Sequence, residues 1–229
     1  MSGQAVTDRT EATGRGEVCA VRMNGIEPRD ACASCYGRPP TGQRSLRKGQ
    51  FLYVEEDPGT HVFPVIEGFL KEEIDLADGR SQGIRILRPG DVAGLEALGF
   101  PNYRATIQAI TPARVCFVPL AEYRATLGRK PEQGVALSCL LTRHVGSLRQ
   151  SVLRLGAMSA DERIRSVLSE LIPSASVGSW VRLPVSRKEL AEIAGLSLGT
   201  VSRQVHRMAR EGQLEVHGRR VRLLKPLLS

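Results

Sequence analysis

The stretch that decides the fold is SRKELAEIAGLSLGTVSRQVHRMAREG, residues 186–212. It predicts two short helices that meet at a glycine turn. Ser186 followed by Glu189 forms a capping box at the start of the first helix. Gly195 can take the positive φ that the turn requires. The buried face of the second helix repeats at helical spacing, with Val201, Val205 and Met208. This pattern is a helix-turn-helix.

The other face of the second helix carries hydroxyl, imidazole and guanidinium groups. Such groups can bond base edges and phosphates in the major groove of a duplex. The sequence therefore predicts double-stranded DNA as a partner, through Thr200, Ser202, Arg203, His206, Arg207 and Arg210. The alternative is a helical hairpin with a solvated basic face.

The residues after this stretch support DNA binding. LEVHGRRVRLL, residues 214–224, predicts two short strands around a basic turn, which makes the module a winged helix-turn-helix. Residues 160–229 hold twelve Arg and Lys against seven Asp and Glu, so most of the net charge of +8 lies there. Neutralised phosphates provide much of the affinity for DNA, and a basic C-terminal module is typical of a duplex binder.

The sequence before the DNA module divides into three further parts. Residues 1–18 hold no apolar period and are expected to form a disordered tail, and residues 19–44 form a cysteine-bearing segment. Residues 45–130 alternate short apolar runs with glycine and proline turns. This pattern predicts a β-roll with an interior pocket.

Residues 131–157 are expected to form one long helix, followed by the DNA module at residues 158–229. Apolar residues recur in the helix at intervals of four and three, which is an a/d seam. We expect two copies of the chain to pair along it, because helix-turn-helix proteins usually dimerise to read palindromic DNA. The alternative is a seam that packs on the β-roll. The predicted dimer interface is Leu141, Val145, Leu148, Val152 and Leu155.

Composition limits the cellular location and the class of protein that the sequence allows. No run approaches the roughly 20 apolar residues of a membrane span, and no secretory signal is present, so we expect a cytoplasmic protein without a membrane partner. Five cysteines, an odd number, indicate thiols or a metal site in a reducing compartment. We find no catalytic triad, paired carboxylates or phosphate-binding glycine loop, so an enzyme is disfavoured. A DNA-binding protein without any sensory function is a third possibility.

The order of these parts resembles the Crp/Fnr superfamily of transcription regulators. The motifs that carry the resemblance are LRKGQFLYVEED, VIEGFLK, ADGRSQGIRILRPGDVAG, SADERI and SRKELAEIAGLSLGTVSRQVHRM. It implies an α+β fold in which a cyclic-nucleotide-binding-like jelly roll is the sensor, the long helix is the dimer interface and the winged module binds DNA. It also implies RNA polymerase as a partner, and it adds Arg187, Lys188 and Ser197 to the DNA contacts.

Within this superfamily the residues favour the Fnr-like branch. The cyclic-nucleotide branch has a carboxylate directly after the glycine of GDVAG and later an Arg-Ser pair, whereas here Leu95 follows Gly94 and Ala105 follows Arg104. The Fnr-like branch has a cluster-ligating cysteine where ARVCFVP places Cys116. The resemblance thus implies an oxygen, nitric oxide or redox sensor with a 4Fe-4S cluster on four thiolates, Cys19, Cys32, Cys35 and Cys116.

Other uses of the cysteines remain open. A thiol or disulfide switch using Cys32 and Cys35, a zinc site, and unligated thiols are the alternatives to a cluster. A cyclic nucleotide or another small effector is the alternative signal. Cys139, at the head of the seam helix, is expected to be a core residue.

Overall fold

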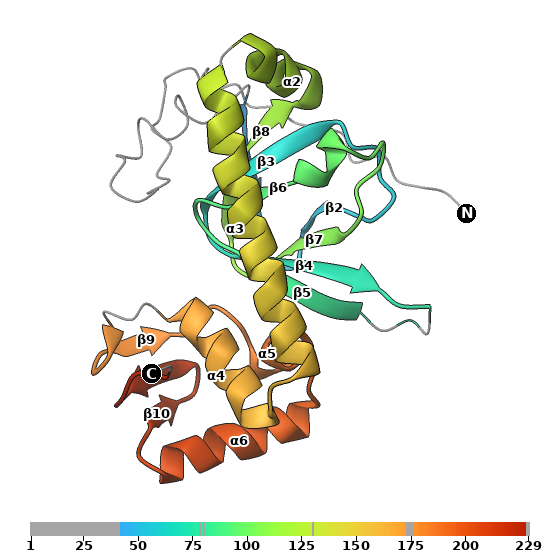
Figure 1. Ribbon diagram of the computed structural model, residues 1–229. Coiled ribbons are helices and arrows are strands. Elements are labelled where there is room, and N and C mark those ends of the chain that lie inside the picture. Colours follow the sequence, from blue (N-terminus) through green and yellow to red (C-terminus); the bar gives the residue numbers. More distant parts are fainter. Residues whose placement is uncertain (1–41, 78, 80, 130, 173–175, 228–229) are drawn as a thin grey trace.

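The computed structural model describes residues 42–77, 79, 81–129, 131–172 and 176–227. Within them a β-roll, a long helix and a winged helix-turn-helix follow one another along the chain (Figure 1). The predicted fold class is therefore confirmed. The predicted tail at residues 1–18 and residues 19–41 of the predicted cysteine-bearing segment lie outside the described residues.

Two antiparallel four-stranded sheets form the β-roll. Their strand orders are β1-β8-β3-β6 and β2-β7-β4-β5. A short 3-10 helix, η1 (Leu95–Leu98), follows β6. The strands are β1 (Gly42–Leu46), β2 (Phe51–Tyr53), β3 (His61–Glu67), β4 (Leu70–Asp75), β5 (Ser81–Leu87), β6 (Val92–Ala93), β7 (Thr106–Ala109) and β8 (Ala113–Pro119).

The roll begins earlier than the sequence predicted. Residues 42–44, assigned to the cysteine-bearing segment, belong to β1, which pairs with β8. Gly42 has a packing role there, since a Cβ at this position would lie 2.5 Å from the Phe117 ring. The absence of a side chain at Gly42 lets this aromatic ring lie against the strand.

Alternate residues of β3 face two different cores. Phe63 and Val65 pack with residues of both sheets and fill the roll. Val62 and Ile66 pack on the other side with Tyr123 of helix α2 (Leu120–Arg129) and with the long helix α3 (Pro131–Gly156). The bounds of α3 match the helix predicted over residues 131–157. None of the described helices is long and apolar enough to cross a membrane.

A buried arginine joins α3 to the next helix, α4 (Ala160–Leu171). Arg154 is 1% exposed, and its Nε donates to Ser166 Oγ at 3.3 Å. Its Nη2 forms an ion pair with Glu170. Both partners belong to α4, so the corner between the two helices is held by charge-assisted hydrogen bonds in a buried setting. Ser159 and Glu162 form a capping box at the start of α4.

The winged module contains α4, α5 (Arg187–Ala194) and α6 (Leu198–Arg210), with a sheet of order β10-β11-β9. The two predicted strands are β10 (Leu214–His217) and β11 (Arg220–Leu223). The sequence did not predict the third strand, β9 (Trp180–Arg182), which pairs with β11. Three residues are too few for periodicity to reveal, and the pairing partner lies some forty positions along the chain.

The helix-turn-helix rests directly on the roll. Ile86 and Ile110 of the roll belong to the same apolar cluster as Ile193 of α5. Gly83 of β5 permits this approach, because a Cβ there would lie 3.1 Å from the Cα of Ile193. Lys48 Nζ forms an ion pair with Glu189 at 2.8 Å. The DNA module is therefore positioned by the sensor domain as well as by α3.

Candidate DNA interface and sensor site

The turn between α5 and α6 has the geometry that the sequence predicted. Ser186 and Glu189 form a complete capping box, each side chain bonding the other residue's backbone N–H. Gly195 ends α5 with φ of 62°. Ser197 caps α6, since its Oγ accepts from the Thr200 backbone N–H at 3.1 Å. The two helices are thus set by local hydrogen bonds at their ends.

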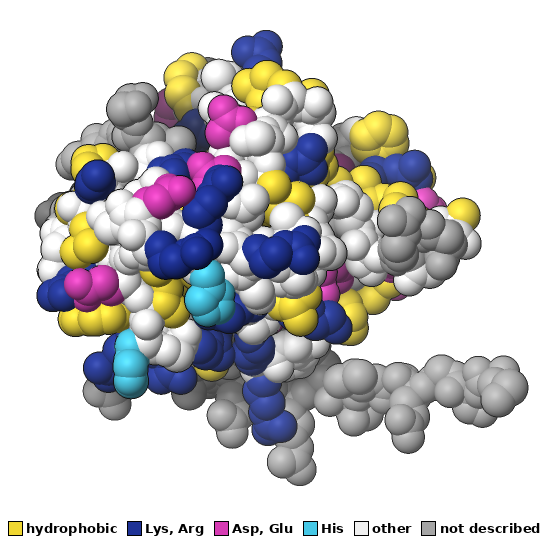
Figure 2. Space-filling model, turned by 90° about the horizontal axis from the view of Figure 1, so that it is seen from below, with side chains coloured by type: hydrophobic (Ala, Val, Ile, Leu, Met, Phe, Trp, Pro, Cys, Tyr) yellow, Lys and Arg dark blue, Asp and Glu magenta, His cyan; other side chains and the backbone are white. Residues whose placement is uncertain are grey.

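The outward face of α6 forms a shallow basic hollow. Figure 2, which looks onto the molecule from the α6 side, shows more basic than acidic side chains across this face, with histidine among them. The hollow is lined by Ser202, Arg203, Gln204, His206, Arg207 and Arg210. Only Gln204 in this set was absent from the prediction. It lies between Arg203 and the buried Val205, at the border of the polar face, where periodicity alone does not decide exposure.

Several of the predicted DNA contacts also have partners within the helix. Thr200 Oγ1 accepts from Arg203 Nη2 at 3.3 Å, and His206 Nδ1 lies 2.8 Å from the Ser202 carbonyl oxygen. Arg203 and His206 nevertheless keep free donor or acceptor positions on an exposed face. These short bonds orient the side chains along the helix.

Arg207 has the strongest competing partner. Its Nη2 lies 3.1 Å from Asp161 Oδ1 of α4. Partial burial opposes ionisation of Asp161, but hydrogen bonds from Arg165 and Arg207 hold the pKa of that carboxyl below its usual value. The Arg207 guanidinium is thus shared between α4 and the DNA-facing surface.

The start of α5 and the wing extend the basic face. Arg187 and Lys188 are both exposed. In the wing, Arg219 Nη2 donates to the Pro184 carbonyl at 3.0 Å, which ties the hairpin to the strand-to-helix connection before α5. Trp180 of the unpredicted β9 lies under Arg222, whose guanidinium carbon is 5.2 Å from the ring centroid.

The seam residues of α3 divide into two groups in the single chain. Leu141, Val145 and Val152 are exposed, with Val152 at 71%. Leu148 and Leu155 are half-buried. Leu155 also faces the helix-turn-helix, because a Cβ on Gly195 would lie 2.7 Å from its Cδ2. The part of the predicted interface that is free to meet another chain is therefore the row of Leu141, Val145 and Val152.

Cys116 lies on β8 with no exposed surface, in the cluster that contains Tyr123 and Leu140. Gln43 of β1 is its cross-strand partner. The other three predicted ligands, Cys19, Cys32 and Cys35, lie outside the described residues. Cys139, predicted as a core residue, is exposed, and that prediction is wrong. Its neighbour Leu140 is the buried residue, and consecutive residues of an α-helix point about 100° apart.

The interior of the roll is filled by its own side chains. The Tyr53 and Tyr103 rings stack with centroids 3.8 Å apart, and Tyr53 Oη donates to Glu96 Oε1 at 3.0 Å. Burial raises the pKa of Glu96. Arg104 points outward and pairs with Glu56 at 2.6 Å. Glu96 and Arg104 thus each have a protein partner in this arrangement.

Comparison with known proteins identifies both halves of the chain. Residues 43–130 match the model of the cyclic nucleotide-binding domain, and residues 162–227 match the Crp-like helix-turn-helix domain. The solved structure of FixK2 from Bradyrhizobium japonicum superposes with a TM-score of 0.73 at 29% identity, covering 80% of this chain and 92% of that one.

Curated relatives cover most of the chain. Nitrogen fixation regulation protein FixK of Bradyrhizobium diazoefficiens is 28% identical over 91% of this chain and 89% of its own length. Transcriptional activator protein FnrA of Stutzerimonas stutzeri is 31% identical over 79% and 76%. The Anaerobic regulatory protein of Aggregatibacter actinomycetemcomitans is 25% identical over 77% and 70%. With these matches, its β-roll and its winged helix-turn-helix, the chain belongs to the Crp/Fnr family of transcription regulators.

Proposed function

We propose that this regulator senses oxygen, nitric oxide or redox state through a 4Fe-4S cluster held by Cys19, Cys32, Cys35 and Cys116, and that the cluster controls dimerisation and binding to palindromic DNA. The observation that carries the proposal is the position of Cys116. It lies beside the point where the chain enters β1 from the cysteine-bearing segment, since Gln43 is its cross-strand partner.

Chain length allows the other three thiols to reach Cys116. Cys35 precedes Gln43 by eight residues, a reach of at most about 29 Å for an extended chain. Cys32 and Cys19 lie farther upstream and have more chain available. Lengthening a flexible loop adds only a slowly growing entropic cost, about (3/2)RT ln n. Four thiolates on one cluster are thus compatible with this topology.

The surroundings of Cys116 fit a cluster ligand. Its neighbours Val118, Tyr123 and Leu140 exclude water from the thiol. Burial and solvent exclusion are among the factors that tune iron-sulfur sites. A bound cluster would supply the chemistry with oxygen or nitric oxide. Since Leu140 belongs to α3, a rearrangement around Cys116 would reach the helix that carries the seam.

The relatives favour a signal of this kind. A regulator whose name describes anaerobic regulation and the activator FnrA both align along three quarters or more of this chain. We propose that two copies pair along Leu141, Val145 and Val152. Their recognition helices would then lie about one DNA turn apart, as in other dimeric helix-turn-helix proteins. Contact with RNA polymerase follows from the same regulatory role.

Anaerobic purification with metal analysis tests the proposal. We expect a brown protein that contains iron and acid-labile sulfide and that loses its colour in air. A colourless protein with stoichiometric zinc would instead establish a zinc site. A colourless, metal-free protein whose DNA affinity follows thiol oxidation would point to the cysteine switch.

A further inference from the structure

An acidic residue of α4 lies beside the DNA-facing side of α6. Asp161, in the first turn of α4, has a guanidinium group at each of its two carboxylate oxygens. Arg165 Nε lies 2.6 Å from Oδ2, and Arg207 Nη2 lies 3.1 Å from Oδ1. Arg165 belongs to α4 itself, whereas Arg207 belongs to α6. The carboxylate therefore connects the two helices.

The start of α4 is fixed by local hydrogen bonds. Arg163, two residues after Asp161, donates from Nε to the Met158 carbonyl at 2.9 Å and from Nη2 to the Leu155 carbonyl at 2.8 Å. These carbonyls belong to the connection before α4 and to the last turn of α3. Asp161 and Arg165 are four residues apart on one side of the helix, so their bond also holds the carboxylate in one orientation.

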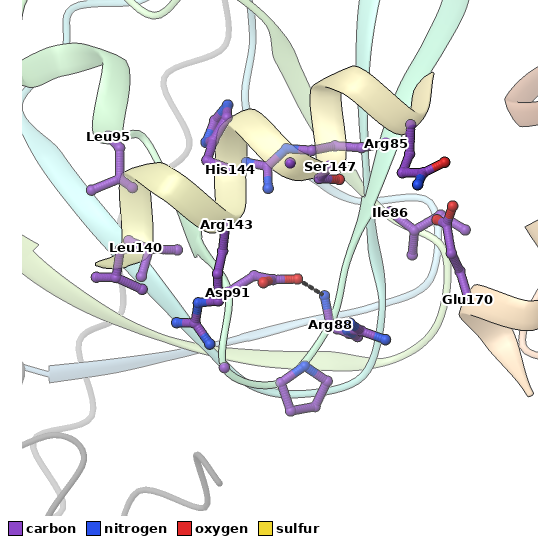
Figure 3. A pocket seen from close by; sticks show the side chains of 15 residues that line it. Arg85, Ile86, Arg88, Asp91, Leu95, Leu140, Arg143, His144, Ser147 and Glu170 are labelled. Carbon is purple, nitrogen blue, oxygen red and sulfur yellow. Dashed lines mark hydrogen bonds between the residues drawn. The ribbon is translucent and has the colours of Figure 1, made fainter. Parts of the chain in front are cut away.

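The other end of α4 is fixed as well. Glu170 forms an ion pair with the buried Arg154 of α3. Figure 3 shows the Glu170 side chain extending from α4 toward Ile86 of the β-roll, and both residues line the same pocket beside α3. A carboxylate on a helix that is held at both ends is a rigid support for a second side chain.

Arg207 lies on the same side of α6 as two of the predicted DNA contacts. It follows Thr200 by seven residues and Arg203 by four, so each of these lies within about 40° of it around the helix. It is about 13 Å along the axis from Leu198, where α6 begins. Base edges are contacted by the N-terminal residues of such a helix, so Arg207 is placed for a phosphate at the edge of the groove.

The charges of these three side chains leave one positive charge for a phosphate. Arg165 and Asp161 neutralise each other in a partly buried setting, with side chains 21% and 19% exposed. Arg207 is exposed. A guanidinium has five N–H donors, so Arg207 can bond Asp161 on one edge and a phosphate on another.

We propose that Asp161 is a positioning residue for DNA binding, which holds the Arg207 guanidinium in place for a phosphate of the DNA backbone. This inference rests on the DNA binding proposed above, but it does not depend on the cluster. An arginine that is oriented before the DNA arrives loses less conformational freedom on binding. Because Asp161 belongs to α4, the readiness of α6 for DNA depends on the placement of α4.

A double-mutant cycle on the full-length protein tests the proposal. The four proteins are the wild type, Asp161→Asn, Arg207→Gln and the double variant, all prepared in the same way. Affinities are measured at several salt concentrations for a palindromic duplex that the wild type selects from a random pool, and for a scrambled duplex. Glu162→Gln is the matched control, because Glu162 is an exposed carboxylate in the same turn and glutamine can keep the cap.

We expect Arg207→Gln to weaken binding to both duplexes and to reduce the slope of log affinity against log salt by roughly one unit, as loss of a phosphate contact should. Asp161→Asn should weaken binding about threefold or more, because Arg207 must then be ordered by the DNA. Its salt slope should stay close to that of the wild type, since the phosphate contact is still made. The double variant should bind like Arg207→Gln, and Glu162→Gln should bind at least as tightly as the wild type.

Other results would overturn the proposal. An equal effect of Asp161→Asn with and without Arg207 would give Asp161 a purely structural role. Tighter binding by Asp161→Asn would show that Asp161 competes with DNA for Arg207, and unchanged binding by Arg207→Gln would remove Arg207 from the interface. A wild type that binds neither duplex would refute the DNA binding itself, and this inference with it. Circular dichroism of each variant checks that it is folded.

Discussion

Lys71 of the β-roll bonds Glu192 of the helix-turn-helix, with 2.9 Å between Nζ and Oε2. The same ammonium lies 2.7 Å from Glu73, and the side chains of Lys71 and Glu73 are almost completely buried. Burial alone would lower the pKa of Lys71, but its bonds to Glu73 and Glu192 hold that pKa above its ordinary value. One buried cation therefore links the sensor to the DNA module.

Replacing this cation should destabilise the protein. Lys71→Met leaves the buried Glu73 carboxylate without its partner, and we expect the free energy of unfolding to fall by about 3 kcal/mol. Lys188→Met is the matched control, because Lys188 is 3.9 Å from the same Glu192 but its side chain is 81% exposed. We expect that control to change stability by less than about 1 kcal/mol. Urea denaturation measures both, and equal losses would contradict the argument.

The contact between Lys48 and Glu189 should weaken in acid. Burial opposes ionisation of Glu189, but its hydrogen bonds with Lys48 and Ser186 lower its pKa below 4.5. A lowered pKa in the folded state gives stability that is present above pH 4.5 and is lost as pH falls through the folded value. Glu189→Gln keeps an N3 side chain that can cap but does not titrate. Denaturant midpoints at pH 7 and pH 4 should therefore fall less in Glu189→Gln than in the wild type.

The dimer interface can be tested without disturbing the monomer. Val152 is 71% exposed in the single chain, so Val152→Asp should fold but should place an unpaired charge in the interface. We expect monomers that bind palindromic DNA weakly. Leu153→Asp is the matched control, since Leu153 is 50% exposed and lies next to the seam but outside it. Light scattering gives the masses, and a dimeric Val152→Asp would place the interface elsewhere.

The proposed cluster predicts the iron and sulfide content of each cysteine variant. Alanine at Cys19, Cys32, Cys35 or Cys116 should greatly reduce iron and sulfide in anaerobic protein, because each removes one of four thiolates. Cys139→Ala should retain full iron content, since Cys139 is exposed on α3. Full cluster occupancy in Cys116→Ala would remove Cys116 from the ligand set.

Arg203 and Arg187 should contribute to DNA binding in different ways. Arg203→Ala should cost about 1 to 3 kcal/mol on the preferred site and relax preference at one base pair, as expected for an arginine that holds guanine through O6 and N7. Arg187→Ala should weaken all sequences equally and reduce the slope of log affinity against log salt by roughly one unit. Titrations on specific and scrambled duplexes measure both. If Arg203→Ala weakens both duplexes equally, Arg203 contacts only phosphate.

Features that depend on neighbouring residues were predictable from the sequence. The capping boxes at Ser159 and Ser186 and the bounds of α3 depend on spacings of three and four residues. The missed features depend on pairing between distant segments. β9 is a strand because it meets β11, and Leu155 is half-buried because it meets Gly195. Neither partner can be identified from local periodicity.

The same limit applies to the candidate sites. The basic residues of α6 were predictable because amphipathic helices separate polar from apolar positions. The bond between Lys71 and Glu192 spans 121 residues. Its sequence signal is only a lysine and a glutamate, both common on protein surfaces.

The buried Arg154 at the corner of α3 and α4 fixes the angle between these two helices, so that they move together as one rigid unit. α3 has 26 residues and is about 39 Å long at 1.5 Å per residue. With the corner held by Ser166 and Glu170, a tilt of α3 by about 5° would displace its far end by roughly 3 Å. α4 would carry Arg207 and the recognition helix with it through Asp161. Leu140, which packs in the same cluster as Cys116, lies about 13 Å from the start of α3 and would move by only about 1 Å in the same tilt. A movement of about 1 Å beside Cys116 thus corresponds to a shift at the far end of α3 that is comparable to the rise of one base pair.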